Sequence, residues 1–147
     1  MRGPNLRNQE GVALVVALLL LLVLTLLGIS AINSTVFETQ ISGNERVGSA
    51  AFYAADGGVN VGISRLPNIT VYSGDVGSDA RYRSGHLTSS SPQPLKKLGV
   101  MNRPGYEAIW EFRRFEVNAT GESFGARKEI EVQLGMGPYG TGTQYNN

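Results

Sequence analysis

Residues 11–32 form an uninterrupted apolar run, GVALVVALLLLLVLTLLGISAI, which contains no charged residue and only two hydroxyl side chains, Thr25 and Ser30. The hydrocarbon core of a bilayer is about 30 Å thick and is crossed by roughly 20 apolar helical residues. The apolar part of a cleaved export signal is shorter, at about 7 to 15 residues. The run therefore predicts a membrane-spanning helix that the chain keeps.

The helical pattern continues beyond this run, because no proline follows it until Pro67. Small and apolar residues recur three to five positions apart, which is the spacing of one helix face. We therefore predict one helix over residues 12–66, about 80 Å long, with residues 12–32 in the membrane and the remainder amphipathic. Its glycine and alanine content favours close packing against neighbouring helix backbones. The stripe consists of Ile32, Val36, Ile41, Gly48, Ala51, Ala55, Gly58, Gly62 and Leu66.

The remaining residues, 67–147, suffice for one small domain. The whole chain carries 13 Lys or Arg and 12 Asp or Glu, so no field of a single sign would attract nucleic acid. It contains no cysteine, which excludes disulfides and thiolate metal sites. We therefore expect packing and partner proteins to stabilise this domain.

Two paired strands are predicted near the end of the chain. Residues 107–119 alternate apolar and polar side chains, and the parity changes at Arg113 and Arg114, which indicates a β-bulge. Residues 129–134 place their apolar side chains on one face, as in a half-buried antiparallel strand. Residues 120–123 supply the glycine and polar residues of a hairpin loop between the two strands.

Shorter strands are predicted at residues 69–72 and 80–83. By composition, residues 85–94 form a loop and residues 135–147 form a flexible, glycine-rich tail. The expected fold is therefore α+β and consists of a long N-terminal helix packed by a small C-terminal antiparallel sheet.

No catalytic or cofactor-binding site is predicted, and the expected protein is not an enzyme. Residues 135–140 spell G-x-G-x-x-G, but Pro138 and the few residues after it leave no helix to complete a dinucleotide site. The single histidine, His86, has no cysteine or second histidine with which to build a metal site or a triad. We expect it to be a solvated loop residue.

Residues 37–59 carry the remaining motif, FETQISGNERVGSAAFYAADGGV. Together with the short basic leader, the apolar run and the small C-terminal domain, this segment resembles type IV pilins and pseudopilins. Most closely, residues 8–66 resemble the N-terminal segment of PilX-type minor pilins, which have a similar Glu, a Gly/Ala-Asn pair, an Arg and an Ala-Phe-x-Ala-Ala-Glu/Asp pattern, usually with Glu at the position of Asp56. The resemblance implies a pilin-like fold and a structural subunit of a type IV pilus.

The resemblance also implies that a prepilin peptidase cuts after Gly11, where a side chain would obstruct the scissile bond. The mature chain would then begin at an N-methylated Val12. Major pilins begin with Phe and carry a Glu at the position that Val16 occupies here. A buried Glu must be paired with a neighbour's amine, so a subunit without it suits the tip or an initiating complex. The residues that the resemblance assigns to assembly are Val16, Gly28, Glu38, Asn44, Phe52 and Asp56.

Some of these residues have other interpretations. Glu38 fits an ion pair between subunits and a solvated helix face about equally well. Phe37, Phe52 and Tyr53 could form an aromatic path along a filament, but packing of the helix against its own domain and its neighbours explains them better.

The expected function is that of a minor pilin. Its partners would be other pilin subunits through helix packing, the prepilin peptidase and the bacterial inner membrane, and it would reach the cell surface when assembled. No cofactor, metal ion, small-molecule substrate or nucleic acid is expected. Two alternatives remain: a pseudopilin of a type II secretion system, and an unprocessed single-pass protein whose domain binds a ligand outside the membrane.

Overall fold

The computed structural model describes the backbone of residues 7–142 and the side chains of residues 11–142. The chain divides into two compact units, Met1–Gly43 and Asn44–Asn147. Helix α1, Arg7–Arg65, contributes to both units, which confirms the predicted long helix. Residues 1–6 of the predicted leader and residues 143–147 of the predicted tail lie outside the described residues.

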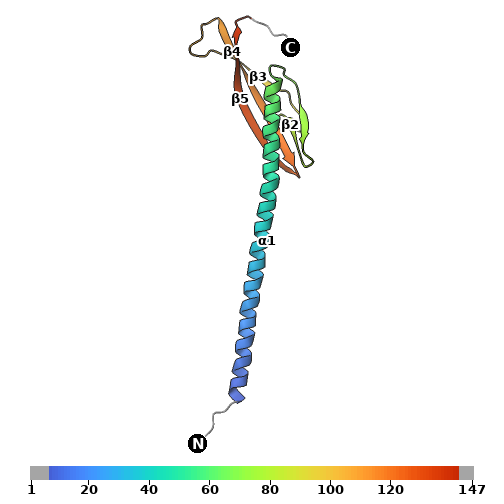
Figure 1. Cartoon of the computed structure of the whole chain (residues 1–147), viewed down its shortest axis with the longest axis vertical. Helices are drawn as coiled ribbons and strands as arrows, with labels where there is room; N and C mark the ends of the chain where they lie inside the picture. Colours follow the sequence, from blue (N-terminus) through green and yellow to red (C-terminus); the bar gives the residue numbers. More distant parts are fainter. Residues whose placement is uncertain (1–6, 143–147) are drawn as a thin grey trace. The chain divides into compact units, whose positions relative to one another are not determined.

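In the first unit, the described residues belong to α1 (Figure 1). Four hydroxyl groups in this segment donate to the carbonyl group four residues earlier, as in Thr25 Oγ1 to Leu21 O (2.7 Å) and Thr35 Oγ1 to Ala31 O (3.1 Å). These bonds satisfy the hydroxyl groups without water. The helix is long and apolar enough to cross a membrane.

The second unit combines the end of α1 with an antiparallel sheet (Figure 1). Its central strand is β4, which pairs along one edge with β5. The other edge of β4 is shared by β2, which pairs with residues 119–123, and by β3, which pairs with residues 112–116. Strand β1 pairs with β2. The strands are β1 (Ser73–Val76), β2 (Ala80–Ser84), β3 (Lys96–Met101), β4 (Trp110–Ser123) and β5 (Ala126–Gly140).

Glycines allow α1 to lie unusually close to β4. A Cβ added to Gly58 would come within 3.0 Å of the Cβ atoms of Ala119 and Tyr82. A Cβ on Gly121 would meet the backbone of α1 at Ala51 and Ala55. The small-residue stripe over residues 51–66 is therefore buried against the chain's own sheet. This confirms the expectation that the upper part of the helix packs on the C-terminal sheet.

The other face of β4 is covered by the predicted loop at residues 85–94, which is confirmed as non-strand. Thr120 Oγ1 donates to Gly85 O (2.8 Å). Arg83 donates to the carbonyl groups of Ser89 (2.5 Å) and His86 (3.2 Å). These bonds hold the loop on the sheet, so β4 is buried on both faces.

The hairpin between β4 and β5 turns later than predicted. Ser123 pairs with Ala126, so the turn consists of Phe124 and Gly125, both at positive φ (43° and 85°). This is the two-residue turn geometry that matches strand twist. Residues 120–123 are strand instead, because the glycine among them serves the close contact with α1 rather than a turn.

Other strand predictions also needed correction. Residues 69–72 are not a strand, and β1 follows them. Strand β3 was not predicted. Strand β5 continues to Gly140, so residues 135–140 do not belong to a loose tail; pairing with β4 orders them. The strand predicted at 80–83 is confirmed as β2.

The β-bulge predicted at Arg113 and Arg114 lies on the neighbouring strands. Lys97 pairs with Phe115 and Gly99 with Arg114, which leaves one extra residue on β3. Glu111 pairs with Tyr139, but Arg113 pairs with Met136, which leaves one extra residue on β5. The change of parity in β4 is therefore accommodated by irregularities on both sides of it.

Tyr72 carries one of two buried side-chain polar atoms that have no hydrogen-bond partner within the described residues. The side chain of Tyr72 is buried, and its hydroxyl oxygen lies close to the position that a Cβ on Gly62 would take. Burial raises the pKa of Tyr72 to about 12, partly offset by the nearby charge of Arg65. The neutral phenol is therefore the form that the core accepts.

We expect Tyr72→Phe to leave the free energy of unfolding at pH 7 unchanged or to raise it by about 1 kcal/mol, because an unpaired buried hydroxyl is removed. Between pH 10 and about 12, ionisation of Tyr72 in the unfolded chain should destabilise the wild type. The variant should lack this loss, which amounts to about 2 to 3 kcal/mol. Denaturant unfolding of the full chain in detergent, followed by fluorescence of Trp110, measures both effects. The exposed Tyr53→Phe is the control; a loss of stability in Tyr72→Phe at pH 7 would contradict the prediction.

Candidate assembly surface and polar sites

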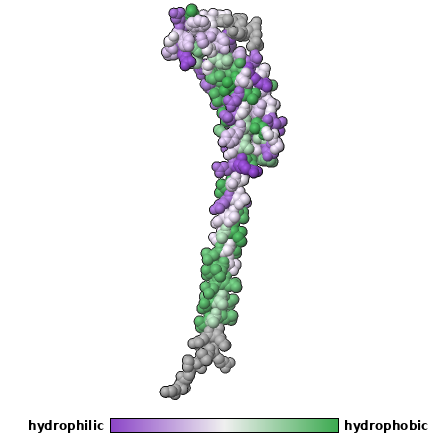
Figure 2. All heavy atoms as spheres, in the orientation of Figure 1, coloured by the Kyte–Doolittle hydropathy of each residue, from purple (hydrophilic) through white to green (hydrophobic). Residues whose placement is uncertain are grey.

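The apolar segment of α1 is exposed along its whole described length. Exposed fractions of its large side chains range from 48% at Val16 to 68% at Leu24. Figure 2 shows this apolar surface as an almost continuous green region. Isolated soluble proteins rarely expose apolar patches of such extent. The segment therefore requires a cover of lipid or of other apolar helices.

Four of the predicted site residues lie on this segment. Gly11 and Gly28 have no neighbouring atoms within 4 Å of an added Cβ, so neither glycine is required by packing within the chain. Val12 and Val16 are exposed. Glu38, further along the first unit, is exposed as well. These positions are open to partners.

The predicted residues of the second unit lie on the side of α1 that is free of the sheet. Asn44, Phe52 and Asp56 are exposed. The rings of Phe52 and Tyr53 contact each other edge to face at 5.8 Å. The prediction that these two aromatic side chains pack against the chain's own domain was wrong. Small buried residues of α1, such as Ala51, occupy the helix face that contacts the sheet.

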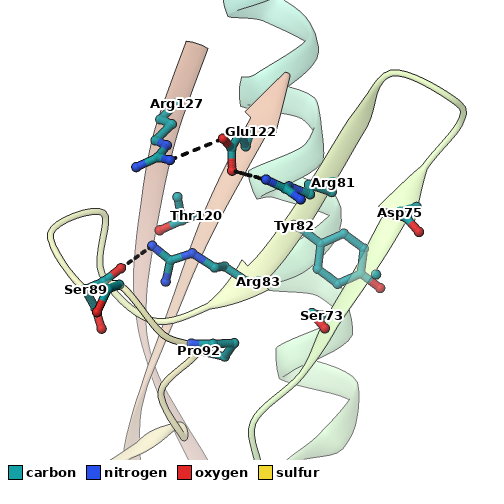
Figure 3. Close-up of a pocket in the computed structure, with 12 residues that line it drawn as sticks. Ser73, Asp75, Arg81, Tyr82, Arg83, Ser89, Pro92, Thr120, Glu122 and Arg127 are labelled. Atoms are coloured by element: carbon teal, nitrogen blue, oxygen red, sulfur yellow. Dashed lines mark hydrogen bonds and ion pairs between the residues drawn. The ribbon is translucent and has the colours of Figure 1, made fainter. Parts of the chain in front are cut away.

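A polar groove on the outer face of the sheet was not anticipated. It measures about 700 Å³ and is lined by side chains from β1, β2, β4, β5 and the loop (Figure 3). Glu122 accepts hydrogen bonds from Arg81 (3.0 Å) and Arg127 (3.3 Å). The bond from Arg81 makes the largest contribution to lowering the pKa of Glu122 below its usual value, and burial opposes it.

The cations of this groove are already engaged by the protein. Arg81 and Arg127 bind Glu122, and Arg83 binds loop carbonyl groups, as the dashed lines in Figure 3 show. These bonds therefore link β2, β4, β5 and the loop on the outer face of the sheet.

A second polar cluster forms where the loop meets β4 and β5. Glu129 Oε1 lies 2.7 Å from Asn118 Nδ2 and 3.0 Å from His86 Nδ1, and Glu129 Oε2 accepts the N–H of Leu87 (2.7 Å). Burial raises the pKa of Glu129, but these hydrogen bonds outweigh it and the net shift is downward. His86 is therefore not a freely solvated residue, which corrects the prediction. Its partners are distant in sequence, so no local motif could reveal them.

Comparison with known proteins finds a family model that matches part of the chain. The family model described as PilX N-terminal matches residues 10–60. These residues comprise the apolar segment and most of the part of α1 that packs on the sheet. No curated protein and no solved structure matches the chain.

Proposed function

We propose that the chain is a minor pilin that acts in pilus assembly or at the pilus tip. The premise of this proposal is that residues 10–60 match the N-terminal segment of the PilX-type family of type IV pilins. The observation that carries this proposal is the apolar surface of α1 over residues 12–32, which the described chain leaves exposed. In a bilayer, lipid would cover it. In a filament, the corresponding helices of other pilins would do so, and the exchange costs little because both surroundings are apolar.

The proposal assigns a role to each part of the chain. Residues 1–11 form the leader that a prepilin peptidase removes in the inner membrane. Residues 12–66 form the assembly helix, and residues 67–147 form the domain that the pilus carries to the cell surface. The exposed residues Asn44, Phe52 and Asp56 are available to neighbouring subunits.

Val16 supports a position at the tip or in an initiating complex. In a pilus shaft, the amine of one subunit would meet a carboxylate of its neighbour, and an unpaired buried charge costs several kcal/mol. A subunit with Val at this position leaves one amine without a partner. Repeated insertion of such subunits along the shaft is therefore unfavourable, whereas a single terminal position is tolerated.

The test is N-terminal sequencing of the protein recovered from sheared surface filaments. We expect a sequence that begins at Val12, in filament fractions that also contain a major pilin. A chain found only in the membrane fraction with its first methionine retained would favour the unprocessed, membrane-anchored binding protein.

A type II secretion pseudopilin shares the processed helix, so cleavage does not distinguish it from a minor pilin. Deletion of the gene does: a minor pilin mutant should lose surface filaments and keep protein secretion. The opposite result would identify a pseudopilin.

A further inference from the structure

We propose that His86, Asn118 and Glu129 bind a divalent transition-metal cation of the Zn²⁺ type, with Glu131 as an additional ligand. The loop after β2 contributes His86, β4 contributes Asn118, and β5 contributes the two glutamates. The potential ligand atoms of His86, Glu129 and Glu131 all lie within 4.8 Å of one another. This site is separate from the apolar surface proposed to act in assembly.

The spacing of three side-chain atoms suits such a cation. His86 Nδ1, Glu129 Oε1 and Asn118 Nδ2 form a triangle with sides of 3.0, 2.7 and 3.1 Å. Around a cation with ligands at about 2.1 Å, neighbouring ligand atoms are separated by about 3.0 Å in octahedral and about 3.4 Å in tetrahedral geometry. Small adjustments would therefore bring the triangle into coordination.

The amide of Asn118 provides an independent indication. Asn118 is only 6% exposed, yet its Oδ1 has no hydrogen-bond partner within the described residues. Rotation of the amide by a half turn would place this oxygen at the position of Nδ2, facing His86 and Glu129. Without a cation, two oxygen acceptors 2.7 Å apart would repel each other. The rotated amide would also leave its Nδ2 in the buried position that has no partner, so the rotation is favourable only when a cation binds the oxygen.

Surrounding hydrogen bonds hold the ligands in place. The backbone N–H of Leu87 donates to the second oxygen of Glu129 (2.7 Å) and so orients the carboxylate. The loop that carries His86 is fixed by the bond from Gly85 N to Asn118 O (2.9 Å). Hydrogen bonds that neighbouring groups make to the ligand residues, and that orient them, are typical of metal sites. One imidazole, an amide oxygen and carboxylates, with no thiolate, suit Zn²⁺, Ni²⁺ or Co²⁺ better than a soft cation such as Cu⁺.

The competing interpretation is a metal-free clamp, in which Glu129 accepts bonds from Asn118, His86 and Leu87 and simply closes the loop. Asn118→Asp separates the two interpretations. In a clamp, the introduced carboxylate would repel Glu129 and the variant would only be destabilised. In a metal site, the variant would be less stable without metal but would bind the cation more tightly, because a carboxylate replaces the amide.

The experiment is calorimetric titration of Zn²⁺ into untagged full-length protein in detergent, with thermal unfolding in Zn²⁺ and in chelator. We expect one ion per chain and a higher melting temperature with Zn²⁺. His86→Ala and Glu129→Gln should each weaken binding at least tenfold, and Asn118→Asp should strengthen it. Glu122→Gln, on the same face of β4 but outside the cluster, should leave binding unchanged.

Absence of Zn²⁺ binding by the wild type would overturn the proposal, as would binding that His86→Ala leaves unchanged. Weaker Zn²⁺ binding by Asn118→Asp would also overturn it and would favour the metal-free clamp. If Glu129→Gln fails to fold, His86→Ala and Asn118→Asp still decide the outcome, since both leave the Glu129 carboxylate in place.

Discussion

Gly121→Ala should destabilise the second unit by about 3 kcal/mol or more, which is at the upper end of the cost of overpacking a core. The added methyl group would meet the carbonyl oxygen of Ala51 and the amide nitrogen of Ala55. Both are backbone atoms of α1, so no side chain can rotate to make room. Relief requires the helix to move away from β4, which opens the core that they share.

Fluorescence of Trp110 should report this loss, because Trp110 lies on β4 and is the only tryptophan in the chain. Denaturant unfolding of the full-length protein in detergent gives the transition midpoint and the dependence on denaturant concentration, and together these give the free energy of unfolding. A marginally stable domain has only about 5 to 15 kcal/mol in total, so the predicted cost is a large fraction.

Gly57→Ala is the matched control, since it makes the same substitution on α1. An added Cβ at Gly57 has no neighbour within 4 Å, whereas the next residue, Gly58, faces β4. Alanine is favoured over glycine within a helix by about 1 kcal/mol, so this variant should be slightly more stable than the wild type. Equal stability of the Gly57 and Gly121 variants would contradict the close approach of α1 to β4.

Gly11→Val should abolish conversion of the precursor to the mature chain. We infer cleavage of the bond between Gly11 and Val12, which lies within α1, where the backbone is closed into helical hydrogen bonds. A peptidase must reach this carbonyl group, and glycine leaves it unobstructed and lowers the cost of local unwinding. A branched side chain at this position shields the bond.

Intact-mass measurement of the membrane fraction detects the difference directly. The wild type should show the mass of residues 12–147, and Gly11→Val the mass of the full precursor, with no subunit in surface filaments. Gly28→Val is the matched control, because Gly28 lies in the same apolar run and also has no neighbour within 4 Å. It should be processed normally. A mature mass in Gly11→Val would exclude this cleavage site.

Much of α1 could be predicted because its signals are local. The uncharged run at residues 11–32 and the proline-free stripe beyond it specify helix through hydrophobic periodicity and length, which need no knowledge of distant residues. The motif at residues 37–59 likewise lies on consecutive turns. The family resemblance therefore emerged from the sequence, and the match over residues 10–60 agrees with it.

The sheet was less predictable because strand pairing depends on distant partners. Residues 69–72 have stronger β propensity than Ser73–Val76, yet the polar segment forms β1 because β2 is available to pair with it. The glycine of residues 120–123 looked like a turn residue. Its role became visible only when Gly121 was found against the backbone of α1.

The primary sequence thus specifies an apolar helix, its small-residue stripe and the resemblance to a family over residues 10–60, since each depends on residues within a few turns of one another. The folded domain specifies which strand that stripe contacts: over residues 51–66 it packs on β4. It also brings together His86, Asn118 and Glu129 from three separate segments. Such a cluster is created by chain folding over long sequence separations, and periodicity along the chain carries no information about it.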